Sequence, residues 1–449
     1  MKRIYEPAAY AAGSLDGCWW PETTRTAPAE ALSSLRGEAR CEFAVIGAGY
    51  AGLNAAITLA EAGGDVVVLD EHEPGWGASG RNGGFCCLGG AKASGEVIAR
   101  RHGTLELARH RATEKAAIAH VAALTDRFGI ALDRHSRGEV QIAHSPRAFR
   151  AMRNEVAGVS AAYQVAAELL SPADLAARGM QVSGLTGPMH GGLWVDLGFA
   201  LNPRKYALGL ARAARALGAR LHARSPALSI TPEGQSYRIT TPEGALRARH
   251  ILLTTNGYSA DNLPRWMAAR YLPLQSSVLV TRPLTEAEIA AQGWSSDVMA
   301  YDSRHLLHYF RLMPDRRMLF GMRGALRWTP AAHAAIRADL RRHFAAMFPA
   351  WAAVEAPHVW SGLVAMSRAL TPYVGPLGDW PRAQAAFAWH GNGVAMGSYA
   401  GAQAARAALG RPTELPRFYA APPRRFELGP ARRLMLAAAY LGYRVIDAA

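Results

Sequence analysis

Apolar positions along the chain follow two different periods, and the first stretch with a clear pattern begins near residue 41. A short apolar run at residues 41–47 ends in glycine, and apolar side chains then recur at helical spacing over residues 53–62. A second apolar run, residues 65–70, ends in Asp70. Because a strand buried on both faces is continuously apolar, this order predicts one complete β–α–β unit.

Beyond this unit the pattern alternates between the two periods, without internal repeats or low-complexity linkers. Helical spacing predicts helices over residues 96–128, 147–170, 203–217, 330–348 and 398–408. Strand-like runs lie at residues 138–143, 220–222, 236–240, 245–248 and 250–255, and again at 272–281, 305–312 and 317–322. The last three runs are richer in aromatic and long side chains, which predicts a separate sheet.

Composition and charge narrow the class of protein. The chain has 449 residues, half of them hydrophobic, which is typical of a globular protein with two domains. Basic residues outnumber acidic ones by 50 to 35, a formal net charge of +15. The basic residues are scattered and are not interleaved with aromatic ones, as a stacking platform would require. We therefore expect a solvated basic surface and no nucleic-acid partner; a weaker alternative is a field that attracts an anionic cofactor and an acidic substrate.

Cysteine usage and the ends of the chain indicate the compartment. The four cysteines, Cys18, Cys41, Cys86 and Cys87, have neither disulfide-framework nor metal-ligand spacing, so we expect a cytoplasmic protein without a metal. We interpret Cys86 and Cys87 as packing residues, with a reactive thiol as the alternative. The first 20 residues lack a signal-peptide core, and the apolar stretch 434–446 is shorter than the roughly 20 residues of a membrane span. We expect no transmembrane segment and a docked terminal helix.

The turn of the β–α–β unit carries a dinucleotide-binding fingerprint. Gly47, Gly49 and Gly52 match the pattern G-x-G-x-x-G between a predicted strand and a predicted helix. Such glycines allow a tight turn, a close approach of the backbone to a pyrophosphate, and close packing of the helix. Asp70 follows the fingerprint by about 20 residues, the spacing of the acidic residue that accepts hydrogen bonds from a ribose. The fingerprint alone does not separate FAD from NAD.

The segment after Asp70 favours FAD. Residues 75–84 hold many small side chains, which suits a backbone that wraps against a flat ligand. With residues 47–52 and 69–71, the run Gly-Ala-Ser-Gly-Arg-Asn-Gly-Gly at 77–84 resembles the D-amino-acid oxidase superfamily of FAD-dependent amine oxidoreductases. The run itself is similar to the γ-glutamylputrescine oxidase-like branch. Further pieces follow in the order of that branch, at residues 201–206, 254–259, 360–364, 370–376 and 390–397.

The resemblance implies a cofactor site with FAD. It places the pyrophosphate at Gly47, Gly49 and Gly52 and the adenosine ribose at Asp70. It assigns the rest of the site to Tyr50, Ala51, Glu71, Gly77, Ala78, Ser79, Arg81, Asn82, Gly83, Gly84, Ala227, Asn256, Gly257, Gly391, Asn392, Gly393, Val394, Ala395 and Met396. Some members attach FAD through a late cysteine or through a histidine aligned with residues 77–84, and this sequence has neither. We therefore expect non-covalent FAD.

The expected fold class is α/β, or α+β overall. It joins a Rossmann-like FAD-binding domain of the glutathione-reductase type to an interleaved substrate domain with a mixed or antiparallel β-sheet. We expect an N-terminal arm over residues 1–38. The remaining ranges are 39–95, 185–270 and 355–449 for the FAD-binding domain and 96–184 and 271–354 for the substrate-binding domain.

The implied chemistry is the oxidation of a small-molecule amine. Hydride passes from the carbon that bears the nitrogen to flavin N5, the imine hydrolyses, and dioxygen or another electron acceptor reoxidises the flavin. We predict His390, Arg323 and Tyr309 as catalytic residues, with His390 steering amine protonation because its unperturbed pKa is near neutrality. A structural role for His390 is the alternative. We predict Arg311, Trp360 and Tyr373 as substrate-binding residues, since an arginine fork binds a carboxylate bidentately.

Two other functions remain open. An NAD(P)-dependent dehydrogenase or reductase has the same fingerprint, although only one G-x-G-x-x-G occurs, so no second nucleotide site accompanies it. A flavin-binding module without turnover is the other alternative. The identity of the amine, the choice between oxidase and dehydrogenase, and the oligomeric state stay open.

Overall fold

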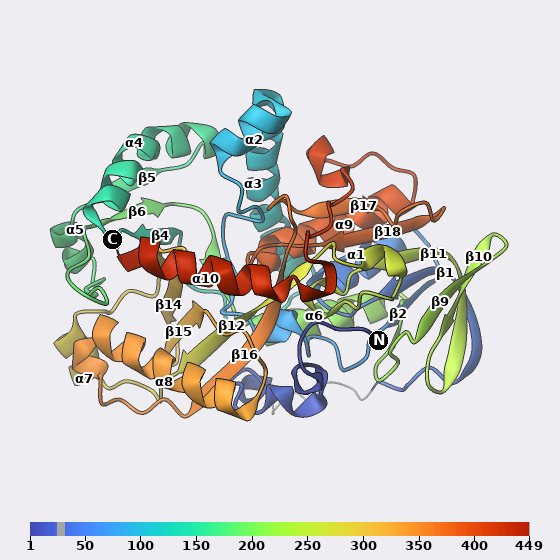
Figure 1. Cartoon of the computed structure of the whole chain (residues 1–449), viewed down its shortest axis with the longest axis horizontal. Coiled ribbons are helices and arrows are strands. Elements are labelled where there is room, and N and C mark those ends of the chain that lie inside the picture. The colour runs from blue at the N-terminus through green and yellow to red at the C-terminus, as the bar shows by residue number, and fades with distance from the viewer. Residues whose placement is uncertain (25–31, 449) are drawn as a thin grey trace.

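The computed structural model describes residues 1–24 and 32–448, and it contains two large sheets (Figure 1). Residues 25–31, a part of the expected N-terminal arm, lie outside the described residues. The fold is a mixture of α and β with parallel and antiparallel pairs, so the predicted fold class is confirmed.

The first sheet is built around the predicted β–α–β unit. Its path is β17 (Tyr373–Pro376), β18 (Ala383–Phe387), β11 (Gly244–Leu253), β1 (Gly37–Ile46), β2 (Val66–Leu69) and β8 (Arg220–His222), with β10 (Ser236–Thr240) and β9 (Ser229–Glu233) added on β11. The five strands from β18 to β8 are parallel. Helices α1 (Tyr50–Glu61), α6 (Pro203–Ala216) and α9 (Ser398–Ala408) pack beside one another. The chain passes from β1 to β2 on one side, and β11 pairs with β1 on the other side. Such sheets bind ligands at the carboxyl ends of the strands where the strand order reverses in this way.

The second sheet has an aromatic core. Its path is β16 (His358–Met366), β12 (Leu272–Val280), β15 (Met318–Arg323), β14 (His308–Leu312), β13 (Met299–Asp302), β4 (Glu139–Ile142), β6 (Gly192–Val195) and β5 (Ala167–Leu170). All its pairs are antiparallel except β13 with β4. Phe310, Phe320, Phe344 and Trp351 are fully buried together, which explains the aromatic composition of these strands.

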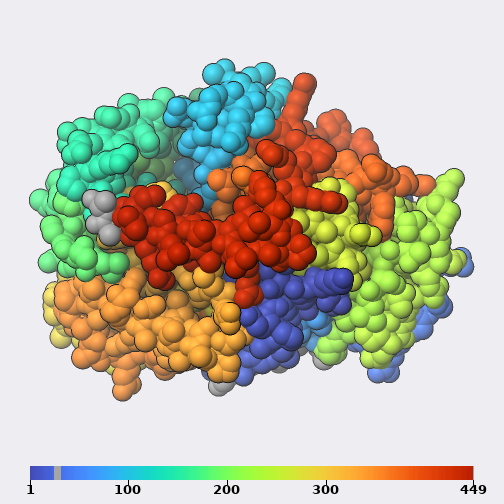
Figure 2. Space-filling model, viewed as in Figure 1, coloured from blue at the N-terminus to red at the C-terminus, as the bar shows by residue number. Residues whose placement is uncertain are grey.

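The other elements surround and connect the two sheets. The remaining α-helices are α2 (Gly95–His102), α3 (Thr104–Arg127), α4 (Pro146–Tyr163), α5 (Pro172–Ala177), α7 (Glu286–Gln292), α8 (Pro330–Met347) and α10 (Arg433–Ala448). Strands β3 (Phe85–Cys86) and β7 (Phe199–Ala200) pair as a small antiparallel sheet. A π-helix, Gly393–Gly397, leads into α9. Short 3-10 helices are Pro7–Tyr10, Ala12–Leu15, Glu22–Thr24, Ala78–Gly80, Asn256–Tyr258, Arg265–Met267, Pro349–Trp351, Arg417–Ala420 and Gly429–Ala431. Helix α10 lies across the front of the molecule, above α8 (Figure 2).

The structure differs from the sequence-based prediction at three places. The helix predicted over 147–170 ends at Tyr163, because Gln164 adopts a left-handed conformation and the chain continues as the edge strand β5. The two strands predicted at 245–248 and 250–255 are one strand, since β11 pairs with β1 along its length. Strands β6 and β16 were predicted in the cofactor domain, but they pair within the second sheet.

The ends of the chain pack against the body. Tyr5, Tyr10 and Trp20 of the N-terminal segment are buried, and α10 packs Leu436 and Tyr440 against the second sheet. Over residues 1–24 and 32–448, no helix is long and apolar enough to cross a membrane.

Candidate active site

The glycine fingerprint forms a tight turn between β1 and α1. Gly47 has a φ of +108°, which a glycine adopts without strain. A Cβ atom on Gly52 would lie 1.8 Å from the carbonyl oxygen of Gly47, so only glycine lets α1 start this close to the strand. Helix α1 begins after Gly49 without a side-chain cap. Its first amides and the positive end of its dipole therefore suit an anionic phosphate.

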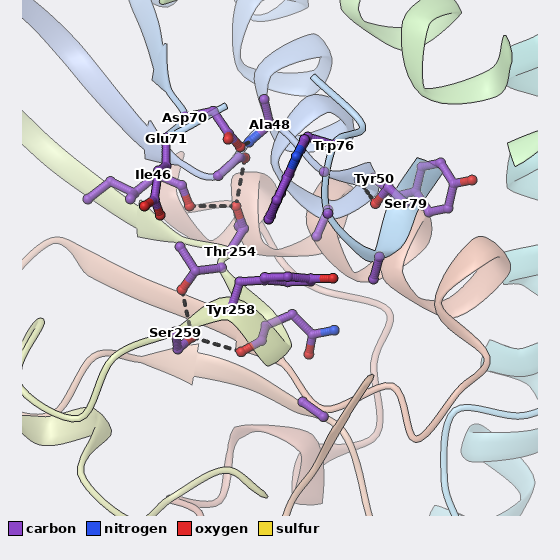
Figure 3. Close-up of a pocket in the computed structure, with 18 of the residues that line it drawn as sticks. Ile46, Ala48, Tyr50, Asp70, Glu71, Trp76, Ser79, Thr254, Tyr258 and Ser259 are labelled. Carbon is purple, nitrogen blue, oxygen red and sulfur yellow. Dashed lines mark hydrogen bonds between the residues drawn. The ribbon is translucent and has the colours of Figure 1, made fainter. Parts of the chain in front are cut away.

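Asp70 holds this turn in place from the end of β2. Its Oδ2 accepts a hydrogen bond from the Ala48 amide at 2.6 Å, and its Oδ1 accepts one from the His72 amide at 2.8 Å (Figure 3). Burial raises the pKa of the Asp70 carboxyl to about 6. A carboxylate has about four acceptor positions, so two remain for a ribose.

A long cavity starts at this turn and runs to the loop before α9. Its wall contains Gly47, Asp70 and Ala227 at one end and Trp389 and Gly391 at the other. Its length and its glycine-rich wall suit an extended dinucleotide rather than a compact ligand. The predicted cofactor residues that line it are Gly47, Gly49, Tyr50, Ala51, Asp70, Glu71, Gly77, Ala78, Ser79, Asn82, Ala227, Asn256, Gly391, Gly393 and Val394.

Several residues of this cavity were not predicted. Arg3 of the N-terminal segment lines it and forms an ion pair with Glu71. The rings of Trp76 and Tyr258 lie in its wall with centroids 5.5 Å apart in an edge-to-face arrangement (Figure 3). The N-terminal residues are far from the fingerprint in sequence and carry no motif, so only the fold reveals their position.

Arg81 was predicted at the cofactor, but its guanidinium serves the protein itself. Its Nε donates to the carbonyl oxygen of Trp76 at 2.7 Å, and its Nη1 donates to that of Ser14 at 2.7 Å. The side chain is fully buried and lies over the Trp76 ring. Arg81 therefore fixes the 75–84 segment against the N-terminal segment, and its atoms reach only the neighbouring cavity described below.

The remaining predicted cofactor residues lie outside the long cavity. Gly83 and Asn392 line the neighbouring cavity instead. Gly52, Gly84, Gly257, Ala395 and Met396 line neither cavity. The glycines allow close backbone packing: a Cβ atom on Gly84 would lie 1.9 Å from the Leu201 carbonyl oxygen, and one on Gly257 would lie 2.9 Å from that of Leu363.

The loop before α9 has an unusual backbone. Ala388, His390 and Gly391 have φ angles of +70°, +53° and +110°, a conformation that side chains rarely adopt. The Ala388 amide donates to Oδ1 of Asn256 at 2.9 Å, which ties the loop to the end of β11. Backbone strain that persists at a cavity wall is typical of functional sites.

The His390 imidazole has both nitrogens engaged. Its Nδ1 donates to the carbonyl oxygen of Gly90 at 2.7 Å, and its Nε2 accepts from the Ser367 amide at 3.2 Å. Burial, together with nearby Lys92 and Arg323, lowers its pKa to about 3. His390 is thus neutral at physiological pH. The expectation that it steers amine protonation near neutrality is corrected, because this imidazole holds the loop.

A second cavity adjoins the far end of the first. The two share Ala78, Asn82, Val364, Gly391 and Val394 as a common wall. Phe85, Tyr301, Leu307 and Tyr309 give the second cavity an apolar and aromatic lining. Tyr309 was predicted as a catalytic residue; its hydroxyl lies 3.0 Å from Oγ of Ser276, and burial raises its pKa. It is a neutral hydrogen-bonding group in the wall.

Two cations face this second cavity. Nη2 of Arg323 donates to the His390 carbonyl oxygen at 2.9 Å, and no described carboxylate forms an ion pair with Arg323. Lys92 also lines the cavity, which keeps its side chain accessible although protein surrounds it. Burial and the nearby Arg323 lower the pKa of Lys92 to about 8. No Asp or Glu occurs among the described residues of this wall, and no motif marks Lys92 in the sequence.

The three residues predicted to bind substrate lie elsewhere. Arg311 donates through Nε to Gly83 at 2.8 Å and through Nη2 to Leu201 at 2.9 Å, both backbone carbonyl oxygens. Its fork is therefore occupied, and burial lowers its pKa to about 9. Trp360 donates to the Arg81 carbonyl oxygen at 2.8 Å, and Tyr373 packs in the core of the first sheet. None of the three lines either cavity, which corrects their predicted role.

The neighbouring cysteines are buried thiols. Burial raises the pKa of both Cys86 and Cys87, so both stay protonated at neutral pH. Cys87 lies in the wall of the second cavity, where its Sγ accepts from Nδ2 of Asn392 at 3.4 Å. These surroundings agree with packing residues rather than with a reactive thiolate. Among the described residues, no group of three or more His, Cys, Asp or Glu is placed to hold a metal ion.

Comparison with known proteins decides the family. Residues 42–407 match the family described as FAD dependent oxidoreductase. The chain belongs to this family. This match confirms the superfamily and the FAD cofactor expected from the sequence, and the glycine turn and the long cavity are consistent with both.

Two curated relatives of this FAD dependent oxidoreductase are similar over most of its length. Probable oxidoreductase OrdL of Rhizobium meliloti (strain 1021) is 32% identical over 405 residues, which cover 88% of this chain and 89% of that protein. Gamma-glutamylputrescine oxidoreductase of Escherichia coli (strain K12) is 28% identical over 283 residues, 63% of this chain and 64% of that protein.

The fold is also shared with solved structures. The glycine oxidase from Geobacillus kaustophilus superimposes with a TM-score of 0.70 at 16% identity, over 85% of this chain and 98% of that chain. At this identity the similarity shows a common fold alone.

The residues present fit FAD. The start of α1 lines the long cavity and suits a pyrophosphate, although its Tyr50 amide donates to Oγ of Ser79 at 2.9 Å. Asp70 keeps free acceptor positions for the ribose, and the shared wall at Gly391 and Val394 suits a flat ring. A Cβ atom on Gly49 would lie 2.9 Å from Oγ of Ser79, so this approach also needs glycine. When bound, FAD would supply a two-electron acceptor, and the residues of the long cavity would hold it.

Proposed function

We propose that this FAD dependent oxidoreductase oxidises a carbon–nitrogen bond of a small amine or amino-acid derivative that carries a carboxylate. The observation that supports the carboxylate is the pair of cations, Lys92 and Arg323, in a cavity without a described lining carboxylate. Arg323 is partly removed from water, which costs free energy unless an anion compensates the charge, whereas Lys92 is exposed and adds positive charge at the same wall. A substrate carboxylate is the anion that this cavity lacks.

The chain binds and orients the substrate in this proposal. The Arg323 fork binds the carboxylate, with its direction set by the bond from Nη2 to the His390 carbonyl oxygen. Lys92 adds a second positive charge, and the paired hydroxyls of Tyr309 and Ser276 offer a donor and an acceptor at the wall. The substrate carbon gives up a hydride and its nitrogen a proton, and water then converts the imine to a carbonyl compound and an amine or ammonia.

A γ-glutamylated amine is the finer candidate for the substrate. It carries a carboxylate for Arg323 and a separate amine for oxidation, and the E. coli relative is named for such a compound. The acceptor in this proposal is dioxygen or another oxidant, FAD is held without a covalent bond, and the protein acts in the cytoplasm. The absence of any cysteine after Cys87 and of histidine at residues 77–84 supports non-covalent FAD.

The test starts from the purified full-length protein. We expect a yellow protein whose flavin is released into the supernatant by acid precipitation. Anaerobic mixing with γ-glutamylated amines, N-methyl amino acids and D-amino acids should bleach the flavin with the carboxylate-bearing members of the panel. Matched amines in which the carboxylate is an amide should bleach it far more slowly.

Three results would contradict the proposal. A colourless protein that binds NAD would favour a nicotinamide-dependent dehydrogenase. A flavin that stays oxidised with every amine would favour a module without turnover. Equal rates with the carboxylates and their amides would remove the role given to Arg323 and Lys92.

A further inference from the structure

A groove outside the substrate cavity gathers arginines from three parts of the chain. It lies between helices α8 and α10, and its floor is the segment from Met322 to Arg327 at the end of β15. Its lining contains four arginines, Arg323, Arg327, Arg342 and Arg444, and a single carboxylate, Asp339. Figures 1 and 2 show α10 and α8 one above the other on the same face of the molecule.

Most of this positive charge is uncompensated. Asp339 accepts from Arg342 at 2.8 Å, which neutralises that pair. Arg323, Arg327 and Arg444 form no ion pair with any described carboxylate, and the Asp447 carboxylate nearby on α10 accepts from the amides of residues 305 and 306.

The histidine in the groove adds no charge to it. Burial and the neighbouring His308 lower the pKa of His343 to about 4. Its Nδ1 lies 2.8 Å from Nε2 of His308, whose own Nδ1 lies 2.6 Å from Asp302. His343 is therefore neutral at pH 7, and the groove keeps three free cations.

Many arginines elsewhere on the surface are paired with a carboxylate, although others, such as Arg147, Arg150 and Arg153 on α4, form no ion pair with a described carboxylate. Ion pairs connect Arg36 with Glu243, Arg137 with Asp196, Arg178 with Glu168, Arg220 with Asp65, Arg238 with Glu38, Arg282 with Glu288 and Arg368 with Glu427. The groove differs from this pattern because its cations converge on one hollow without acidic partners.

Arg323 connects the groove to the substrate cavity. Arg323 lines both, and the two consecutive residues Leu306 and Leu307 line the groove and the cavity respectively. Helix α10 packs beside the second sheet, with Tyr440 in one hydrophobic cluster with Leu272 and Leu274 of β12. Arg323 is thus the residue common to the positively charged groove and the positively charged cavity.

We propose that this groove is the access route of the substrate, in which Arg327 and Arg444 attract the carboxylate of an approaching small molecule and Arg323 receives it. This inference rests on the proposed function, since it assumes a carboxylate-bearing amine. Clefts that carry one sign of charge focus the field and raise association rates of oppositely charged ligands. The effect falls with ionic strength, since the screening length is about 8 Å at physiological salt and about 3 Å at 1 M.

The test measures association with the holoenzyme by stopped-flow flavin absorbance. The probes are benzoate and its neutral isostere benzamide, which suit the aromatic cavity. The variants are Arg327→Gln, Arg444→Gln and the double variant, and the control is Arg150→Gln, an exposed arginine on α4 outside the groove.

We expect the double variant to lower the association rate constant of benzoate about tenfold at low salt. The difference should vanish at 1 M salt, and benzamide and the control variant should show no change. The dissociation rate constant should change less than twofold, because neither arginine contacts the bound carboxylate.

Other outcomes separate this inference from the proposed function. Equal benzoate association in wild type and double variant, or no benzoate binding in the wild type, would overturn the access route even if amines reduce the flavin. Association that depends on groove charge, with a flavin that no amine reduces, would support the groove and contradict the proposed oxidation. An equal loss for benzamide would mean a change of shape rather than of charge, and would also overturn it.

Discussion

The guanidinium of Arg323 donates a 2.9 Å hydrogen bond to the backbone carbonyl oxygen of His390, and this contact joins the two sheets at the site. Arg323 ends β15 of the second sheet, and His390 follows β18 of the first. The carbonyl oxygen uses one of the five N–H donors of this arginine, and Arg323 lines the second cavity, so other donors remain for a ligand. The contact therefore fixes a cation at the wall of the second cavity, where we propose that the substrate binds.

The first prediction concerns Arg323. Replacement by glutamine removes the charge but keeps a donor for the His390 carbonyl oxygen. A hydrogen bond to a charged group contributes roughly 1.5–3 kcal/mol, so kcat/KM for a carboxylate-bearing amine should fall about 10- to 100-fold. The matched amide of the same amine should be oxidised at nearly the wild-type kcat/KM. An equal loss for both compounds would mean that Arg323 supports only the loop.

The second prediction concerns pH and Lys92. Its pKa is lowered to about 8, so Lys92 is a cation below this pH and loses its charge above it. Carboxylate affinity should therefore be highest below pH 8 and should weaken as the pH rises through that value. In Lys92→Met this dependence should disappear and affinity at pH 7 should be lower. Flavin absorbance titrations with benzoate from pH 6 to 10 measure both effects.

His390 supplies an internal check on the same titration. Burial lowers its pKa to about 3, so it should contribute no change of affinity between pH 6 and 7. A transition near pH 6.5 that persists in Lys92→Met would contradict the neutral, hydrogen-bonded imidazole seen here.

The cofactor half of the site was predictable because its chemistry is local in sequence. The Gly47–Gly52 turn and the acidic end of β2 need only neighbouring residues, and the structure places them together in the long cavity. Arg81 shows the limit of such a motif, because its guanidinium binds backbone oxygens, among them that of Ser14 in the N-terminal segment. A sequence motif shows that an arginine is present, but the groups that this arginine binds depend on the whole fold.

The substrate half was less predictable because its residues come from distant segments. Arg311 and Arg323 both lie on strands of the second sheet, and the pattern did not distinguish them. The fold occupies Arg311 with the carbonyl oxygens of Gly83 and Leu201 and leaves Arg323 facing the cavity. Lys92 follows two glycines without any periodic pattern, so only the tertiary structure shows that it shares a wall with Arg323.

The third prediction tests the glycine turn. In Gly52→Ala the new methyl group meets the Gly47 carbonyl oxygen at 1.8 Å, and both atoms sit on backbone that cannot move freely. Such overpacking costs roughly 1–3 kcal/mol, so the free energy of unfolding should fall by this amount and FAD content should drop. Gly158→Ala on α4 is the control, because nothing lies within 4 Å of its added Cβ atom. Alanine there should leave stability unchanged or raise it by about 0.5–1 kcal/mol. Thermal melts of the two variants decide between a local clash and a general intolerance of alanine.

The fourth prediction concerns Asp70, which both fixes the turn and lines the long cavity. Asp70→Asn replaces one acceptor oxygen by a donor, so one of the amides of Ala48 and His72 loses its partner. The loss of a charged hydrogen bond of roughly 1.5–3 kcal/mol should weaken FAD binding about 10- to 100-fold. Asp70→Glu keeps both acceptors and should bind FAD more tightly than Asp70→Asn. The control is Asp65→Asn, which removes an exposed ion pair with Arg220 and should leave FAD affinity unchanged.

The pH dependence of FAD binding gives a separate readout for Asp70. Burial raises its pKa to about 6, so the carboxyl becomes protonated as the pH falls through this value and loses acceptor capacity. The affinity of wild-type apoprotein for FAD should therefore weaken below pH 6, whereas Asp70→Asn should lack this component. Fluorescence titrations of apoprotein with FAD from pH 5 to 8 measure the difference. Parallel profiles for the two proteins would assign the acid sensitivity to another group and would remove Asp70 from contact with the ribose.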